Sequence, residues 1–276
     1  MKNISISRIK DQIDALRLIG LDETGGTTRL SYSPEYINGQ ALVREYMEEA
    51  GMTVRLDGAG NLVGTYAGSE AQLAPVMTGS HLDTVPGGGP LDGALGIIAA
   101  IECIACWHRS GWRPQRTVEV VAMIEEEGTR FGVTCFGSRA MTGEFSGLAG
   151  KEIADIRGQT LPELLAGMGL DTEIAIREED DPRRLHAFVE LHVEQGAELE
   201  EADLPVGIVT AIVGIERFEV TIRGEANHAG TTGMNRRKDA LVAAADLIRF
   251  VHDSARSAGG EYVATVGRLE VKPNAE

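Results

Sequence analysis

The sequence predicts an α/β fold in which a mixed, mostly parallel β-sheet is flanked by helices. Strand-like apolar runs alternate with helical patterns along most of the chain, as they do in βαβ units. The run 117–124 is apolar at nearly every position, which is typical of a strand buried on both faces of a parallel sheet. Three such runs end in histidine or acidic residues, and ligands bind at the carboxyl ends of strands in sheets of this kind.

Helical spacing, capping signals and apolar runs of strand length define the elements of the larger part of the chain. Ser33 followed by Pro34, for example, is typical of an N-cap and the first position of a helix. Helices are expected over 4–19, 34–50, 96–108 and 161–168, and strands over 53–56, 61–66, 75–81, 117–124 and 187–191.

The pattern changes near Val213. A strand over 217–223, a helix over 235–258 and a strand over 262–269 resemble half of a small βαβ domain. We therefore predict a larger domain over 1–212 and the first half of a smaller α+β domain over 213–276.

Composition argues against several classes of partner. The net charge of −16 and the pI near 4.8 disfavour nucleic acid and anionic membranes, which both attract basic surfaces. The N-terminus has no apolar signal region, and the longest apolar run, 94–107, contains Glu102 and is too short to cross a bilayer. The three cysteines cannot all pair, which indicates a reducing compartment, so a cytoplasmic protein is expected. Cys103 and Cys106 lie in an apolar helical pattern and are expected to be buried thiols.

The strand ends carry a candidate metal site. His81 and Asp83 end one strand, and Asp92 follows after a glycine-rich loop. Imidazole and carboxylate are suitable ligands for divalent transition ions, and an aspartate beside a ligating histidine can fix the tautomer of the imidazole. Since two later strands end in the cluster Glu125–Glu127 and in His192, the three strand ends are expected to converge on one metal site.

The three consecutive glutamates indicate the chemistry. They would repel one another unless a cation neutralises them, although a solvated acidic loop is the alternative. One carboxylate can bind an ion while its neighbour acts as general base toward a water that the ion activates, and Asp92 could bridge a second ion. The sequence therefore predicts metal-assisted hydrolysis. His228, in a loop of small residues, could grip an oxyanion or could belong to a mere turn.

Five ordered motifs carry a family resemblance across nearly the whole chain. They are Gly79–Thr84, Leu91–Gly93, Glu125–Phe131, Glu190–Gly196 and Asn227–Thr232. In these motifs the chain resembles the amidase/hydantoinase/carbamoylase branch of the M20 metallopeptidase-like family, which includes N-carbamoyl-L-amino-acid hydrolases, β-ureidopropionases and allantoate amidohydrolases. The resemblance implies a di-zinc exopeptidase-like catalytic domain over 1–212, with part of a lid and dimerisation domain over 213–276.

The resemblance also implies a role for each matching residue. The implied metal ligands are His81, Asp92 (bridging), Glu127 and His192. Glu126 would be the general base, and Asp83 the partner of His81. Gln195 would contact the substrate, and His228 would stabilise the tetrahedral intermediate. The implied cofactors are two divalent ions, zinc before manganese, cobalt or nickel, in a homodimer that cleaves a ureido or carbamoyl C–N bond and releases ammonia and carbon dioxide.

Two features depart from the family pattern. Gly233 stands where the family has proline, which should loosen the loop of His228. Family members are also longer, and a last ligand histidine and the Asn and Arg that bind the substrate would lie beyond Glu276. The chain is therefore expected to be a fragment, a truncated gene product or a partial record with weak or no activity by itself. The alternatives are an M20-type di- or aminopeptidase, and an inactive homologue that serves as a binding or dimerising module.

Overall fold

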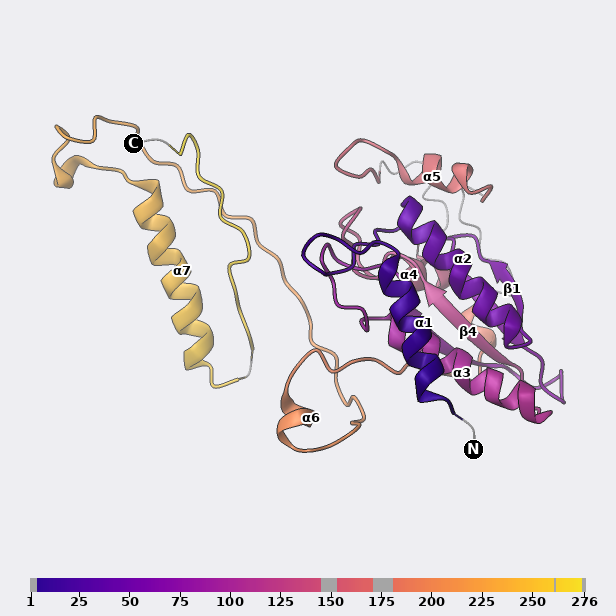
Figure 1. Cartoon of the computed structure of the whole chain (residues 1–276). Coiled ribbons are helices and arrows are strands. Elements are labelled where there is room, and N and C mark those ends of the chain that lie inside the picture. Colours follow the sequence, from indigo (N-terminus) through magenta and orange to yellow (C-terminus); the bar gives the residue numbers. More distant parts are fainter. Residues whose placement is uncertain (1–3, 145–152, 171–180, 261, 275–276) are drawn as a thin grey trace. The chain divides into compact units, whose positions relative to one another are not determined.

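A computed structural model describes residues 4–144, 153–170, 181–260 and 262–274. The chain divides into two compact units, Met1–Val206 and Gly207–Glu276 (Figure 1). The division falls close to the expected domain boundary, and the roles assigned to the two domains stay predictions.

The larger unit is built on one mixed β-sheet. Its described strands are β1 (Thr53–Leu56), β2 (Leu62–Tyr66), β3 (Val76–His81), β4 (Val118–Met123) and β5 (Ala187–Val189), in the spatial order β1-β2-β4-β3-β5. The β1–β2 hairpin and the β2–β4 pair are antiparallel, whereas β3 is parallel to both β4 and β5. The carboxyl ends of β3, β4 and β5 therefore lie at the same edge of the sheet.

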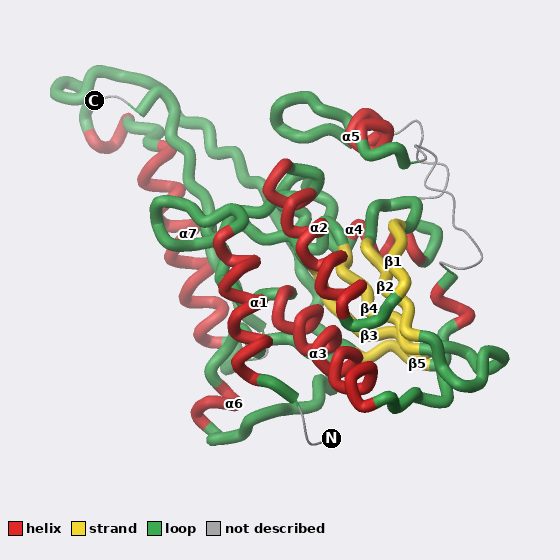
Figure 2. Tube along the Cα trace, turned by 45° about the vertical axis from the view of Figure 1, so that its right-hand side comes forward, coloured by secondary structure: helices red, strands yellow, loops and turns green. Residues whose placement is uncertain are grey.

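Helices flank this sheet, as the sequence predicts. The described helices of the larger unit are α1 (Ile6–Leu18), α2 (Pro34–Glu49), α3 (Ala94–Ser110), α4 (Phe136–Met141), α5 (Leu161–Gly167) and α6 (Glu198–Glu201). Figure 2 shows α1, α2 and α3 together on one side of the strands. Ser33 caps α2 by accepting a hydrogen bond from the Tyr36 backbone N–H, and Pro34 is the first helical residue, so that prediction is confirmed.

The sheet buries apolar side chains on both faces. In β4, Val120 and Ala122 belong to the main core with the buried faces of α2 and α3, while Val121 points to the other face. There Val121 packs with Met77 and with Met141 of α4. Burial on both sides explains why this strand is a nearly continuous apolar run instead of an alternating one.

The smaller unit contains the helix α7 (Ala240–Ser257) and a short 3₁₀ turn at Met234–Arg236. Asp239 caps α7 by accepting hydrogen bonds from the backbone N–H groups of Leu241 and Val242. The strands predicted over 217–223 and 262–269 are wrong for the described residues, in which neither segment pairs with another strand. A strand requires a hydrogen-bonded neighbour, and the pattern of side chains in a sequence cannot supply one.

None of the described helices is both long enough and apolar enough to span a membrane.

Candidate metal centre

The sheet edge gathers the imidazoles and carboxylates that the sequence singles out. His81 is the last residue of β3, Glu126 and Glu127 follow β4, and His192 follows β5. Two groups have ligand atoms that lie within 4.8 Å of one another, namely His81 with Asp92 and His192, and His81 with Glu126 and Glu127. His81 belongs to both groups, so the five side chains form one continuous cluster.

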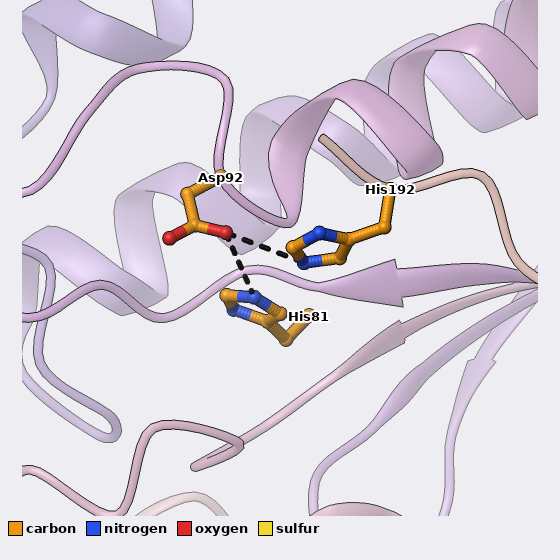
Figure 3. A group of neighbouring side chains, drawn as sticks. All are labelled: His81, Asp92 and His192. Atoms are coloured by element: carbon orange, nitrogen blue, oxygen red, sulfur yellow. Dashed lines mark ion pairs between the residues drawn. The ribbon is translucent and has the colours of Figure 1, made fainter. Parts of the chain in front are cut away.

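Asp92 lies between the two histidines. Its Oδ1 atom is 3.3 Å from His192 Nε2 and 3.7 Å from His81 Nε2, and Figure 3 shows both imidazoles turned toward this oxygen. The Oδ1 atom is buried and has no hydrogen-bond partner among the described residues. The other oxygen, Oδ2, accepts a hydrogen bond of 2.8 Å from the Gln195 side chain. A buried carboxylate oxygen that faces two ring nitrogens without a hydrogen bond fits a position that a cation occupies.

Both histidines are held in the tautomer that suits metal binding. His81 Nδ1 lies 2.9 Å from the backbone carbonyl oxygen of Asp83, and His192 Nδ1 lies 2.8 Å from that of Val193. A carbonyl oxygen can only accept, so each Nδ1 must carry the proton and donate it. The lone pair of each neutral ring is therefore on Nε2, the atom that faces Asp92.

Gly93 makes the approach of Asp92 to His81 possible. It precedes α3 with φ +63°, and a Cβ atom at this position would lie 2.7 Å from the His81 ring and 2.3 Å from the His81 carbonyl oxygen. No side chain fits at such distances, so glycine is required for both its conformation and its lack of a Cβ.

Asp83 has a broader role in the structure than the sequence suggests. Its backbone carbonyl fixes the His81 tautomer, while its carboxylate oxygens accept 3.1 Å hydrogen bonds from the N–H groups of Glu126 and Glu127. Its Oδ1 atom is 3.8 Å from His81 Nδ1, which is an ion-pair distance but not a hydrogen bond. Burial raises the pKa of Asp83, against the opposing effects of His81 and these N–H groups. One aspartate therefore links the ends of β3 and β4.

The three consecutive glutamates do not act together. Glu125 has φ +53°, and its buried carboxylate accepts hydrogen bonds from the backbone N–H groups of Arg130 and Phe131. Only Glu126 and Glu127 belong to the cluster. The first carboxylate thus stabilises the loop that presents the other two.

Negative charge dominates the electrostatics of the cluster. Although burial, the largest single effect, lowers the pKa of His81, the carboxylates of Asp92, Asp83 and Glu126 together raise it to about 9. Burial raises the pKa of Glu127, and the negative charges of Asp92 and Glu126 raise it further, against the opposing effect of His81. A divalent cation would relieve both effects, because it replaces the His81 proton and neutralises the carboxylates. The donor set therefore fits a divalent metal.

His228 lies in the smaller unit, whose position relative to the cluster is not defined. Its Nδ1 atom accepts hydrogen bonds of 3.0 and 3.2 Å from the backbone N–H groups of Gly230 and Thr231. Since an N–H group can only donate, Nδ1 is unprotonated, and the neutral ring carries its proton on Nε2. His228 is thus prepared to donate a hydrogen bond through Nε2.

Cys135 also lies at the cluster, and the sequence does not predict it there. The Cys135 thiol lies 3.6 Å from Glu126 Oε1, and burial raises its pKa, with a further contribution from the negative charge of Glu126. A glutamate followed nine positions later by a cysteine is not a recognised motif, so the sequence carries no signal for this contact.

Fold and site together define a class, namely an α/β protein whose parallel strand ends gather imidazoles and carboxylates at one edge of the sheet. The model of Peptidase family M20/M25/M40 matches residues 77–269, and the chain belongs to this family. The resemblance stated from the motifs is therefore confirmed.

Curated relatives and solved structures agree with this assignment. Over 266 residues the chain is 42% identical to an N-carbamoyl-L-amino acid amidohydrolase of Geobacillus stearothermophilus, with 96% of this chain and 64% of the relative covered. Over 267 residues it is 39% identical to an allantoate amidohydrolase of Escherichia coli (strain K12), with the same coverage of 96% and 64%. A hydantoinase/carbamoylase family amidase from Burkholderia vietnamiensis has a TM-score of 0.79 at 32% identity, with 99% of this chain and 65% of that chain covered. The chain thus spans about 64% of the length of these curated relatives.

Proposed function

We propose that the chain carries the metal site of a metal-dependent amidohydrolase. The reaction is hydrolysis of the C–N bond in the ureido or carbamoyl group of a small acid, such as allantoate or an N-carbamoyl-L-amino acid. The observation that carries this proposal is the buried Asp92 Oδ1 atom, which faces two imidazole nitrogens and accepts no hydrogen bond among the described residues. The names of the relatives support the substrate class.

The residues that would hold the metal are His81, Asp92, Glu127 and His192. In this proposal Asp92 would bind both of two divalent ions, with zinc as the first choice before manganese, cobalt or nickel. When bound, such ions polarise a carbonyl oxygen and lower the pKa of a coordinated water to about 7.

The chain's own groups would move the proton. Glu126 is the proposed general base, since its carboxylate lies at the cluster, with Oε2 4.0 Å from His81 Nε2, and its side chain is 40% exposed and therefore open to water. It would take a proton from the attacking water and deliver it to the departing nitrogen as the C–N bond breaks. His228 would donate a hydrogen bond from Nε2–H to the oxygen that becomes negative in the tetrahedral intermediate. Gln195, whose amide holds Asp92, would contact the substrate beside that carboxylate.

Two other functions compete with this one. A di- or aminopeptidase is the second candidate, and the description of the matching family as a peptidase family favours it. An inactive homologue that acts as a binding or dimerising module is the third. The homodimer and the cytoplasmic location stay predictions.

The deciding experiment measures ammonia release from allantoate, N-carbamoyl-L-amino acids and N-carbamoyl-β-alanine, beside cleavage of dipeptides. It is run on this chain and on the chain extended to the length of its relatives, each with zinc, manganese, cobalt or nickel added. Metal-dependent ammonia release supports the proposal. Dipeptide cleavage alone supports the peptidase, and a chain that binds no tight divalent ion supports the inactive homologue.

A further inference from the structure

We propose that Cys135 is a positioning residue for Glu126, which it holds in place through a hydrogen bond from its thiol to the glutamate carboxylate. The inference rests on the proposed function, in which Glu126 is the general base. It concerns a residue to which neither the motifs nor the family match assigns a role.

Cys135 is bound to Glu126 at two points. Its backbone N–H donates a 2.8 Å hydrogen bond to the Glu126 carbonyl oxygen, and its Sγ atom lies 3.6 Å from Glu126 Oε1. The two neighbouring backbone bonds, from Phe136 to Glu125 at 3.0 Å and from Gly137 to Ile124 at 2.9 Å, continue the same ladder. The backbone of Cys135 is therefore fixed opposite Glu126, and its side chain starts from a defined position.

The conformation of Cys135 supports a specific placement of the thiol. The residue precedes α4 and has φ +55°, in the left-handed region of backbone conformation that residues other than glycine seldom adopt. Such a conformation persists when the surrounding contacts enforce it, and it concentrates at functional sites. Here the enforcing contacts are the three ladder bonds.

The two oxygens of Glu126 then have different surroundings. Oε1 accepts from the thiol, while Oε2 lies 4.0 Å from His81 Nε2. A single weak donor on Oε1 limits rotation of the carboxylate and leaves Oε2 directed at the cluster, where a general base must meet the attacking water. Serine could supply the same donor, whereas alanine could not.

The first test detects the hydrogen bond between the Cys135 thiol and the Glu126 carboxylate and requires no enzymatic turnover. The infrared S–H stretching band of Cys135 is recorded in a Cys103→Ala/Cys106→Ala background, so that no other thiol contributes. We expect a band at the lower wavenumber of a hydrogen-bonded thiol, which moves to higher wavenumber when Glu126→Ala removes the acceptor. A band that Glu126→Ala leaves in place would overturn the inference.

The second test measures how the positioning of Glu126 by Cys135 affects kcat. In the chain extended to the length of its relatives, Cys135→Ala is expected to lower kcat by about threefold to tenfold, with KM and metal content unchanged, while Cys135→Ser keeps kcat within about twofold of the parent. Cys103→Ala is the matched control, because Cys103 is likewise half-buried but lies in α3 away from Glu126. Equal kcat for Cys135→Ala and the parent, at equal melting temperature, would refute the inference. If the parent itself releases no ammonia, the proposed function fails, and the infrared band still decides the contact.

Discussion

The Nε2 atom of His192 lies 3.3 Å from the Oδ1 atom of Asp92, a buried oxygen that accepts no hydrogen bond among the described residues. Its partner oxygen is bound by Gln195 and both histidine rings are anchored through Nδ1, so the carboxylate and the imidazoles are already oriented. Groups that are held in place before the ligand arrives lose little conformational entropy when it binds.

Replacement of Asp92 by asparagine should remove most bound metal. The substitution keeps the shape of the side chain but deletes the negative charge between His81 and His192. We expect the metal content after dialysis to fall at least tenfold, as measured by inductively coupled plasma mass spectrometry. Glu144→Gln is the control, because it removes a carboxylate from the exposed ion pair with Arg139. Equal loss in both variants would argue against a specific site.

Glu126→Gln should separate catalysis from metal binding. Glutamine cannot accept the proton of the attacking water, so ammonia release should fall by about 10²-fold to 10⁴-fold. Metal content should stay near that of the parent, since the proposed ligand after β4 is Glu127. Retained turnover would refute the assignment of Glu126 as the base, and lost metal would identify it as a ligand.

Metal binding should release protons in a pH-dependent manner. The pKa of His81 in the metal-free chain is raised to about 9, so at lower pH this ring is protonated and an ion must displace the proton. The apparent affinity should therefore rise with pH and level off as pH passes about 9. Calorimetric titration in buffers of different ionisation enthalpy measures the proton release. Affinity independent of pH below this value would contradict the assignment of His81 as a ligand.

Gly93→Ala should cost more stability than a glycine substitution at the other end of the same helix. Gly93 and Gly111 flank α3 with φ +63° and +68°, but a Cβ at Gly93 would meet the His81 ring, whereas one at Gly111 meets nothing within 4 Å. Gly111→Ala should cost about 1 kcal/mol of unfolding free energy, and Gly93→Ala clearly more, with loss of metal. Denaturant unfolding measures both. Equal costs would show that the contact with His81 is unimportant.

Nitrogen NMR should find His228 with its proton on Nε2 at alkaline pH. The backbone N–H groups of Gly230 and Thr231 both point at Nδ1, which must accept them. His252, on α7, serves as the reference histidine in the same spectrum. A neutral His228 that carries its proton on Nδ1 would disprove the bonds to this loop.

The sequence predicted the elements whose signals are local. The cap at Ser33 and the apolar run of β4 needed no knowledge of distant residues, and both are confirmed. The strand predicted over 187–191 ends at Val189, because its pairing with β3 stops there. The segments 217–223 and 262–269 carry strand patterns but lack a paired neighbour among the described residues. Pairing is a property of two segments, and a pattern in one of them cannot report it.

The same limit explains what the sequence does not predict at the site. The sequence predicts that five side chains converge, because parallel strands share an edge. The structure brings these side chains together, namely His81, Asp92, Glu126, Glu127 and His192. Glu125 does not belong to the cluster, because its backbone adopts a left-handed conformation that its neighbours in sequence do not specify. The contact between Cys135 and Glu126 depends on how the loop between them folds back.

The hydrogen bond between Gln195 and Asp92 joins residues that are 103 positions apart. A growing polypeptide that has left the ribosome only as far as α4 holds His81, Asp92 and the glutamates but not His192, and so it has an incomplete set of donors. If an ion binds as proposed, its full set of donors would be complete only after the segment of β5 has joined the sheet. Retention of metal by a purified sample would accordingly serve as a simple assay for correct assembly of the larger unit.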